Sequence, residues 1–485
     1  MTPGLDIIEL TIGQFHEALM RVEITCKELV EIYLGRIERL DQSTGLNSMV
    51  VLNPGAAERA NELDEELRET GKLRPLHGVP AIIKDNYDTK DLQTSAGSIA
   101  LRNSLPPDDA YQVKKLREAG IVVLGKSNMA EWAFSPYQTV SSIAGTTRNP
   151  YDLKRVPAGS SGGTAAAIAA NLGLIGLGTD TGNSIRGPSS HCCLVGIRST
   201  MGLTSRDGIV PLYLRNDVGG PICRTVEDAV RVLDIISGYD PMDPITKRSS
   251  DKIPDSYLKY IDSNGLKNKR IGVFRYYTEK SSTDPEIRKI FNTALRDMEK
   301  NGAILVDPFT IPDFDELTED IWCNTFKRGL RKYLESLENP PIKSVEEVYE
   351  RGLYSDYIED RLKRMAESDL DPGCGDLFTE PKNIRLRKQI MDKMNEYALD
   401  VFVYPTWSNP PRLIGDMESP AGDNSQKIPP HTGLPGFTVP MGYSHRNLPA
   451  GLQIVGKLFS EPTLIEIAYD YEQTTMHRKP PKGFN

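Results

Sequence analysis

Cysteine is scarce in this sequence, with six residues among 485. Apart from the adjacent Cys192 and Cys193, the cysteines show no paired spacing of the kind that marks a disulfide framework or a zinc site. We therefore expect free thiols in a reducing compartment, and we expect neither a metal ion nor any other cofactor.

Long apolar runs and an excess of positive charge are also missing. The longest apolar run, residues 164–177, is shorter than the ~20 residues that a membrane-spanning helix needs. The start of the chain has neither the basic nor the apolar section of a signal peptide. The net charge is −9, so no broad basic surface is available for a phosphate backbone. We expect a cytoplasmic monomer or homodimer that acts on a small molecule and binds neither nucleic acid nor membrane.

The sequence that remains is typical of a globular α/β protein, with 39% hydrophobic and 26% charged residues. Residues 10–40 and 54–70 have the pattern of amphipathic helices, with Thr11 and Thr25 as possible N-caps and Gly71 as an end signal. Strand, loop and helix patterns then alternate from residue 79 to about residue 238, which predicts a covered sheet. Later strands are expected at residues 270–274, 400–404, 437–441 and 450–455, and later helices at residues 284–301 and 463–475.

No stretch of the chain has the composition of a free linker, so we expect one large domain over residues 1–485. Within it, residues 1–75 are predicted to form an N-terminal helical region and residues 78–238 the α/β core. Residues 313–393 are charged and less regular, and they are predicted to form a helical insertion.

Three motifs resemble well-known sites but lack the structural context of those sites. Residues 120–127 fit the phosphate-loop pattern G-x-x-x-x-G-K-S, but a predicted helix precedes the first glycine and a β-branched strand separates the two. Residues 159–163 fit G-x-S-x-G around Ser161, but a loop precedes them and none of the six histidines is placed like a catalytic base. Cys192 and Cys193, beside His191, are typical of small core residues. These patterns favour neither nucleotide binding, nor Ser–His–Asp catalysis, nor a catalytic thiol.

Three other segments make chemical sense together, although each alone also fits a surface lysine or a plain turn. They are residues 78–86, 157–163 and 178–188. A serine needs a base to act as a nucleophile, and burial lowers the pKa of a lysine toward the range where it is neutral. Lys84 follows an apolar strand, Ser160 is placed to relay a proton, and the glycine-rich backbone before Ser184 is suited to an oxyanion site.

These segments resemble the amidase signature family. The K-D-N strand end, the glycine–serine loop and the T-D-x-G-x-S-x-R run are all present, and further family motifs occur at residues 124–132, 147–151, 195–208 and 220–229. The resemblance implies a single α/β/α domain around a twisted mixed sheet. It also makes residues 78–238 the signature core and residues 313–393 a variable insertion that shapes the substrate pocket.

The resemblance also assigns roles to individual residues. It implies that Ser184 is the nucleophile, that Ser160 is the bridging serine on a cis peptide bond, and that Lys84 is the base. The family usually has glycine where this chain has Asn183, before the nucleophile. The oxyanion hole would use the backbone N–H groups of Thr181, Gly182, Asn183 and Ser184, and the residues that hold this loop would be Ser161, Asp180 and Arg186.

The function predicted in this way is hydrolysis of a small linear amide through an acyl-enzyme, with esters, anilides and carbamates as further candidate substrates. Two alternatives stay open: the glutaminase subunit of a tRNA-dependent amidotransferase, and a non-catalytic binding protein on the same fold. Aromatic residues are candidates for the substrate pocket, although each is also typical of a core position: Trp132, Phe134, Tyr137, Trp322 and Trp407.

Overall fold

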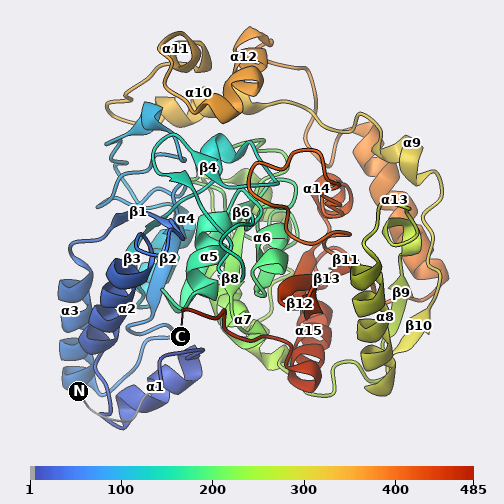
Figure 1. Cartoon of the computed structure of the whole chain (residues 1–485), viewed down its shortest axis with the longest axis horizontal. Helices are drawn as coiled ribbons and strands as arrows, with labels where there is room; N and C mark the ends of the chain where they lie inside the picture. The colour runs from blue at the N-terminus through green and yellow to red at the C-terminus, as the bar shows by residue number, and fades with distance from the viewer. Residues whose placement is uncertain (1–5, 485) are drawn as a thin grey trace.

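The structure, a computed structural model, describes residues 6–484 and is built around one mixed β-sheet of 11 strands (Figure 1). The strand order is β1-β3-β2-β6-β8-β7-β12-β13-β11-β9-β10. This sheet confirms the predicted α/β fold. Its strands are β1 (Met49–Leu52), β2 (Pro80–Lys84), β3 (Val122–Ser127), β6 (Ile175–Asp180), β7 (Val195–Arg198), β8 (Val218–Cys223), β9 (Arg270–Val273), β10 (Ile304–Val306), β11 (Val401–Pro405), β12 (Gly436–Ser444) and β13 (Leu448–Gly456), and a separate pair is formed by β4 (Val140–Ser141) and β5 (Gly145–Thr146).

The N-terminal helices begin where the sequence predicts. Helix α1 (Ile12–Met20) is capped by Thr11 and helix α2 (Cys26–Leu40) by Thr25, each in a complete capping box. Helix α3 (Ala56–Thr70) ends at Gly71 in the left-handed conformation. Strand β1 also lies in this region and pairs with β3, which the sequence analysis did not predict. Residues 1–5, part of the segment without a signal-peptide pattern, and residue 485 lie outside the described residues.

The two central strands β2 and β6 are parallel neighbours, with Ile82 opposite Gly176 and Ile83 opposite Leu177. Because parallel strands end at the same edge of a sheet, Lys84 at the end of β2 lies close to the end of β6. Helix α5 (Gly162–Ala169) packs against both strands, directly after Ser160 and Ser161. Three segments that are distant in the sequence therefore meet at one edge of the sheet.

Glycines allow helix α5 to approach its neighbours closely. A Cβ atom on Gly163 would lie 2.1 Å from the carbonyl oxygen of Asn128, and a Cβ atom on Gly176 would lie 2.5 Å from the side chain of Thr164. Both distances are far below van der Waals contact. The start of α5, and with it the glycine–serine loop, is therefore held against the sheet by backbone that leaves no room for a side chain.

The helices of residues 313–393 gather away from the centre of the sheet. Helices α10, α11 and α12 lie together at the top of Figure 1, and α9 and α13 lie at its right. The α10–α12 group shares an apolar cluster with Phe134 and Tyr213 of the core. The division of the chain into a core and an insertion stays a prediction. The bounds are α9 (Phe314–Thr318), α10 (Phe326–Glu335), α11 (Val345–Glu350), α12 (Glu359–Glu367) and α13 (Pro381–Glu396).

Helices α8 and α15 agree with the segments predicted at residues 284–301 and 463–475 to within a few residues. Helix α8 follows its N-cap Asp284, and α15 is the closing helix. Within residues 6–484, none of the helices combines the length and the apolar composition that crossing a membrane requires. The remaining bounds are α4 (Tyr111–Glu118), α6 (Arg186–His191), α7 (Val226–Ile236), α8 (Pro285–Lys300), α14 (Ile428–Thr432) and α15 (Glu461–Thr475).

The prediction that all six cysteines are free thiols is wrong for two of them. Cys323 and Cys374 form a disulfide between two irregular segments that are 51 residues apart. Sequence spacing could not reveal this pair, because the two segments meet only through the folding of the helices between them. The other four cysteines are free, as predicted, and all four are buried: Cys26, Cys192, Cys193 and Cys223.

We expect Gly163→Ala to destabilise the protein by ~1–3 kcal/mol, because the new methyl group must displace the backbone of Asn128. Gly35→Ala is the matched control, since Gly35 lies in helix α2 with no other atom within 4 Å of its Cβ position. That variant should gain up to ~1 kcal/mol from helix propensity. Urea unfolding of both variants measures the difference, and a Gly163→Ala protein as stable as wild type would refute the close packing of α5.

Candidate active site

Lys84 is completely buried and points at two hydroxyl groups. Its Nζ donates hydrogen bonds of 2.7 Å to Ser160 Oγ and of 2.7 Å to Thr179 Oγ1. Burial lowers the pKa of Lys84 to about 7, against Asp180 and Asp217, which act to raise it. A large fraction of this amine is therefore neutral near physiological pH. Thr179 was not predicted, although it stands inside the T-D-x-G-x-S-x-R segment, one residue before Asp180.

Ser160 lies on a cis peptide bond with Gly159, as the family resemblance implied. Its carbonyl oxygen accepts a hydrogen bond from the Ala130 backbone N–H. A Cβ atom on Gly159 would lie 2.5 Å from the carbonyl oxygen of Ser135, so a side chain cannot be accommodated before Ser160. Close backbone packing on both sides thus fixes the position of the hydroxyl that contacts Lys84.

Ser184 stands on the turn between β6 and α6, at the wall of a cavity. Its hydroxyl is directed at Asn183 Oδ1, 3.4 Å away. No hydrogen bond joins Ser160 to Ser184 in the part of the chain that the structure describes. The structure therefore brings Lys84 and Ser160 together, and the contact between Ser160 and Ser184 in the predicted relay stays a prediction.

The loop of residues 181–184 is suited to hold an oxyanion. All four residues line the cavity. The Gly182 carbonyl accepts a hydrogen bond of 2.7 Å from Arg186 Nη2 in the protein interior. Among residues 6–484, no hydrogen-bond acceptor is found for the backbone N–H groups of these four residues. Unused donors beside a nucleophile are what stabilisation of a tetrahedral intermediate requires.

Asp180 holds this loop through two buried arginines. Its carboxylate accepts hydrogen bonds from Arg186 Nε at 3.0 Å and from Arg198 Nη1 at 2.9 Å. Burial alone would raise the pKa of Asp180, but Arg186 and Arg198 outweigh burial and lower the pKa to about 2. Asp180 is therefore ionised at neutral pH. Arg198 was not predicted as a site residue, although it ends β7 within the family motif at residues 195–208.

Ser161, the serine of the G-x-S-x-G pattern, helps to hold the backbone of the site in place. Its hydroxyl donates to the Thr179 carbonyl at 3.2 Å and accepts from the Thr179 N–H at 3.3 Å. The hydroxyl of Ser161 is thus occupied by backbone. Residues 120–127, which fit the phosphate-loop pattern, also have a structural role. Lys126 lies on strand β3, and its Nζ donates a hydrogen bond of 2.7 Å to the Tyr87 carbonyl.

Asn183 connects the loop of residues 181–184 to a distant segment of the chain. Its Nδ2 donates to Asp423 Oδ2 at 2.8 Å, and Gln426 Nε2 donates to the same oxygen at 2.7 Å. Asp423 keeps some exposed surface, yet it is withdrawn far enough from water that its pKa is raised to about 7. Neither Asp423 nor Gln426 was predicted, because no family motif quoted above covers residues 423–426.

The cavity beside Ser184 has a volume of about 200 Å³. Of the five predicted pocket aromatics, Phe134 and Trp322 line it. The other three predicted aromatics, Trp132, Tyr137 and Trp407, are not among the described residues of its wall. Trp132 packs against Phe326, and Trp407 packs against both His191 and Tyr137. Apart from the loop of residues 181–184, most of the lining is apolar. The remaining lining residues are Ala133, Pro136, Leu212, Tyr213, Arg361 and Gln426. In the described part of the chain, no group of three His, Cys, Asp or Glu side chains is placed to hold a metal ion.

Comparison with known proteins identifies the family. The Amidase family model matches residues 28–465. The chain is 36% identical to a probable amidase of Arabidopsis thaliana, over 99% of this chain and 93% of that protein. It is 33% identical to a subunit of the glutamyl-tRNA(Gln) amidotransferase of Acinetobacter baumannii, over 97% of each chain. Among solved structures, the native peptide amidase from Stenotrophomonas maltophilia has a TM-score of 0.87 at 35% identity, covering 98% of each chain. The chain thus belongs to the amidase signature family and is a hydrolase that acts on the carbon–nitrogen bonds of amides.

Proposed function

We propose that this enzyme hydrolyses a small linear amide through an acyl-enzyme on Ser184, with Lys84 as the base and Ser160 as the proton relay. The observation that carries the proposal is the contact of 2.7 Å between Lys84 Nζ and Ser160 Oγ in a fully buried setting. The lowered pKa of Lys84, about 7, supports the same role, because a base must be unprotonated before it can act.

In the acylation step, Ser184 Oγ attacks the amide carbon as its proton passes to Ser160, while the proton of Ser160 passes to Lys84. The carbonyl oxygen becomes an oxyanion beside the backbone N–H groups of residues 181–184, which line the cavity. The proton then returns through Ser160 to the leaving nitrogen, and the carbon–nitrogen bond breaks. Water repeats the sequence at the acyl-enzyme and releases the acid.

The acyl group that the site favours is apolar or aromatic. Phe134, Leu212 and Trp322 face the cavity beside Ser184, so a hydrocarbon or aryl group gains by leaving water there. The likeness to a solved peptide amidase makes peptide amides the first substrates to test, next to anilides, esters and carbamates.

Oligomeric state and location stay predictions. The monomer or homodimer and the cytoplasmic location come from the sequence alone. The Cys323–Cys374 disulfide argues for an oxidising compartment instead, because such bonds are rare where thiols are kept reduced.

Ser184→Ala should lower kcat for every cleaved amide by ~10⁴-fold or more, because the attacking hydroxyl is lost. A fluorophosphonate probe should label Ser184 in the wild type, and peptide mapping by mass spectrometry locates the adduct. Ser161→Ala is the control, since that hydroxyl bonds to the Thr179 backbone and should not be needed for labelling. An adduct on any other residue, or undiminished turnover in Ser184→Ala, would contradict the proposal.

The pH profile should report the ionisation of Lys84. Below about pH 7 the amine is protonated, so kcat/KM should fall about tenfold per pH unit, and above that value it should level off. Thr179→Val removes an acceptor that stabilises the charged ammonium, so the pKa of Lys84 should fall and the acid limb should move to lower pH. A profile in Thr179→Val that is unshifted, or shifted upward, would show that another group controls the rate.

The glutaminase alternative rests on the likeness to a glutamyl-tRNA(Gln) amidotransferase subunit. If this chain acts alone on small amides, glutamine should release ammonia at less than a tenth of the rate measured with an apolar acyl amide. A coupled ammonia assay makes the comparison, with Ser184→Ala as the blank. Glutamine preferred over every apolar amide would favour the amidotransferase interpretation.

A further inference from the structure

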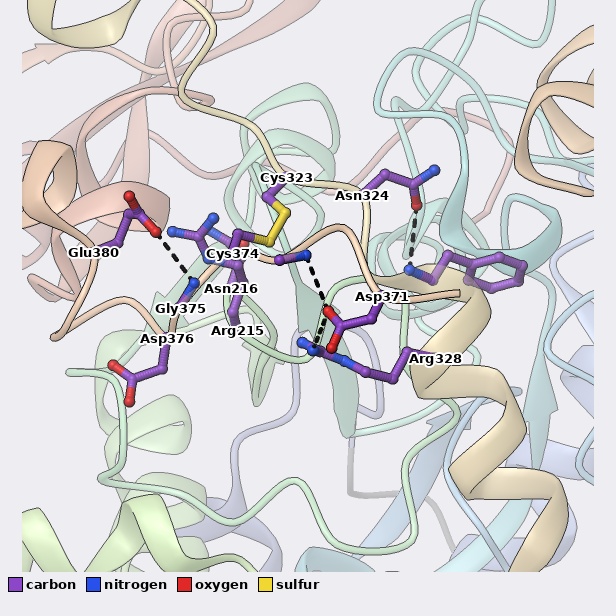
Figure 2. Close-up of a disulfide and its surroundings, with 12 residues drawn as sticks. Arg215, Asn216, Cys323, Asn324, Arg328, Asp371, Cys374, Gly375, Asp376 and Glu380 are labelled. Atoms are coloured by element: carbon purple, nitrogen blue, oxygen red, sulfur yellow. Dashed lines mark hydrogen bonds and ion pairs between the residues drawn. A yellow bond between two sulfur atoms is a disulfide. The ribbon is translucent and has the colours of Figure 1, made fainter. Parts of the chain in front are cut away.

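The Cys323–Cys374 disulfide joins two irregular segments of chain whose backbones are weakly held, although the first segment is anchored at its start by the buried Ile321. Figure 2 shows the bond between Cys323 and Cys374. Cys323 lies between α9 and α10 in the sequence, and Cys374 lies between α12 and α13. In the described chain, neither residues 320–324 nor residues 369–375 make a backbone–backbone hydrogen bond. The contacts that do hold the second segment are peripheral, and they include the Arg328–Asp371 ion pair, in which Asp371 is 63% exposed. Exposed pairs of this kind contribute little.

The residue before Cys323 is part of the wall of the active-site cavity. Trp322 lines the cavity together with Ser184. Its ring lies 4.2 Å from that of His431 and 6.0 Å from that of Tyr213, measured between centroids. Trp322 is also 41% exposed, so these edge contacts hold it against the wall without burying it. Its backbone lies between Ile321, which is buried in an apolar cluster, and Cys323, so the disulfide holds one of the two sides of Trp322.

The disulfide also closes the stretch of chain that covers this side of the cavity. Helices α10, α11 and α12 lie between the two cysteines in sequence. Phe326, at the start of α10, packs on Phe134 at 4.8 Å, and Arg361 of α12 lines the cavity. One bond thus fixes both ends of the segment that supplies Phe326 and Arg361.

The two cysteines are accessible in a way that the others are not. Cys323 and Cys374 are half-buried, whereas Cys26, Cys192, Cys193 and Cys223 are buried. Thiol–disulfide exchange needs a thiolate to reach a sulfur atom. A reducing agent in solution can therefore reach this bond while the four free thiols stay covered.

We propose that the Cys323–Cys374 bond is a redox-operated clamp on the substrate pocket: reduction by a dithiol frees the Trp322 wall and weakens substrate binding, while Ser184 stays reactive. The dithiol is a small molecule or a protein with two neighbouring thiols. One of its thiolates attacks a sulfur of the pair and forms a mixed disulfide, and its second thiol resolves that bond. The dithiol becomes a disulfide, and its two electrons and two protons end on the cysteines as thiols.

If the disulfide acts as this clamp, its reduction should change KM and leave kcat unchanged. Reduction of the native wild-type enzyme with dithiothreitol should raise KM for an apolar acyl amide about threefold to tenfold, as loss of one aromatic contact would. It should change kcat and the rate of fluorophosphonate labelling of Ser184 by less than twofold, and reoxidation should restore KM. The double variant Cys323→Ser/Cys374→Ser should have the KM of the reduced wild type, and dithiothreitol should not change that KM.

Trp322→Ala is the variant that separates this clamp from a purely structural disulfide. With the bond intact it should already show the raised KM, and dithiothreitol should raise KM no further. The same reagent effect in Trp322→Ala as in wild type, or an unchanged KM in the reduced wild type, would overturn the proposal. Thermal unfolding of each form confirms that the comparison is made on folded protein.

A second measurement keeps the clamp separate from the proposed function on which its KM effect rests. Trp132 and Trp407 are 2% and 4% exposed, so quenching of tryptophan fluorescence by acrylamide reports mainly on Trp322. Quenching should rise on reduction of wild type and of Ser184→Ala alike. Failure of amide hydrolysis with this rise present would refute the proposed function and leave the clamp standing, whereas unchanged quenching would refute the clamp.

Discussion

The charge of Asp180 is the feature on which the geometry of the site depends. This carboxylate has no solvent around it, and it stays ionised because Arg186 and Arg198 both contact it. An isolated buried charge would be strongly unfavourable, and so would each guanidinium alone. As a group they fix the end of β6, the start of α6 and the end of β7 relative to one another. The loop of residues 181–184 lies between the end of β6 and the start of α6.

The same charge also affects the pKa of Lys84, the proposed base. Burial pushes the pKa of Lys84 down, and the negative charges of Asp180 and Asp217 push it up, so that it settles at about 7. Without these carboxylates the pKa of Lys84 would be lower, and its amine would be a weaker base. The acidic residues therefore have two effects: they hold the loop in place, and they raise the basicity that the proposed role of Lys84 requires.

Features set by neighbouring residues were predictable from the sequence. Thr11 and Thr25 cap their helices through residues three positions away, and Lys84 follows an apolar strand that could be seen in a run of five residues. Pairing between distant segments was predictable only where family motifs covered both partners, as for Lys84 and Ser160. Asn183 and Asp423 are 240 residues apart, and Cys323 and Cys374 are 51 apart with three helices between them. The aromatic candidates show the same limit, because side-chain type alone did not distinguish Trp322 in the cavity wall from Trp407 in the core.

The hydrogen bonds from Asn183 and Gln426 to Asp423 have a consequence for attempts to change the substrate. The three side chains form one polar unit at the cavity, and a Cβ atom on Gly182 would lie 2.1 Å from Gln426 Oε1. Changing any one of them alone removes at least one of these hydrogen bonds and leaves the remaining polar groups less well paired, which is costly where they are partly buried. Libraries built for new specificity should therefore vary positions 183, 423 and 426 jointly, since single-site screens would discard combinations that work only as a set.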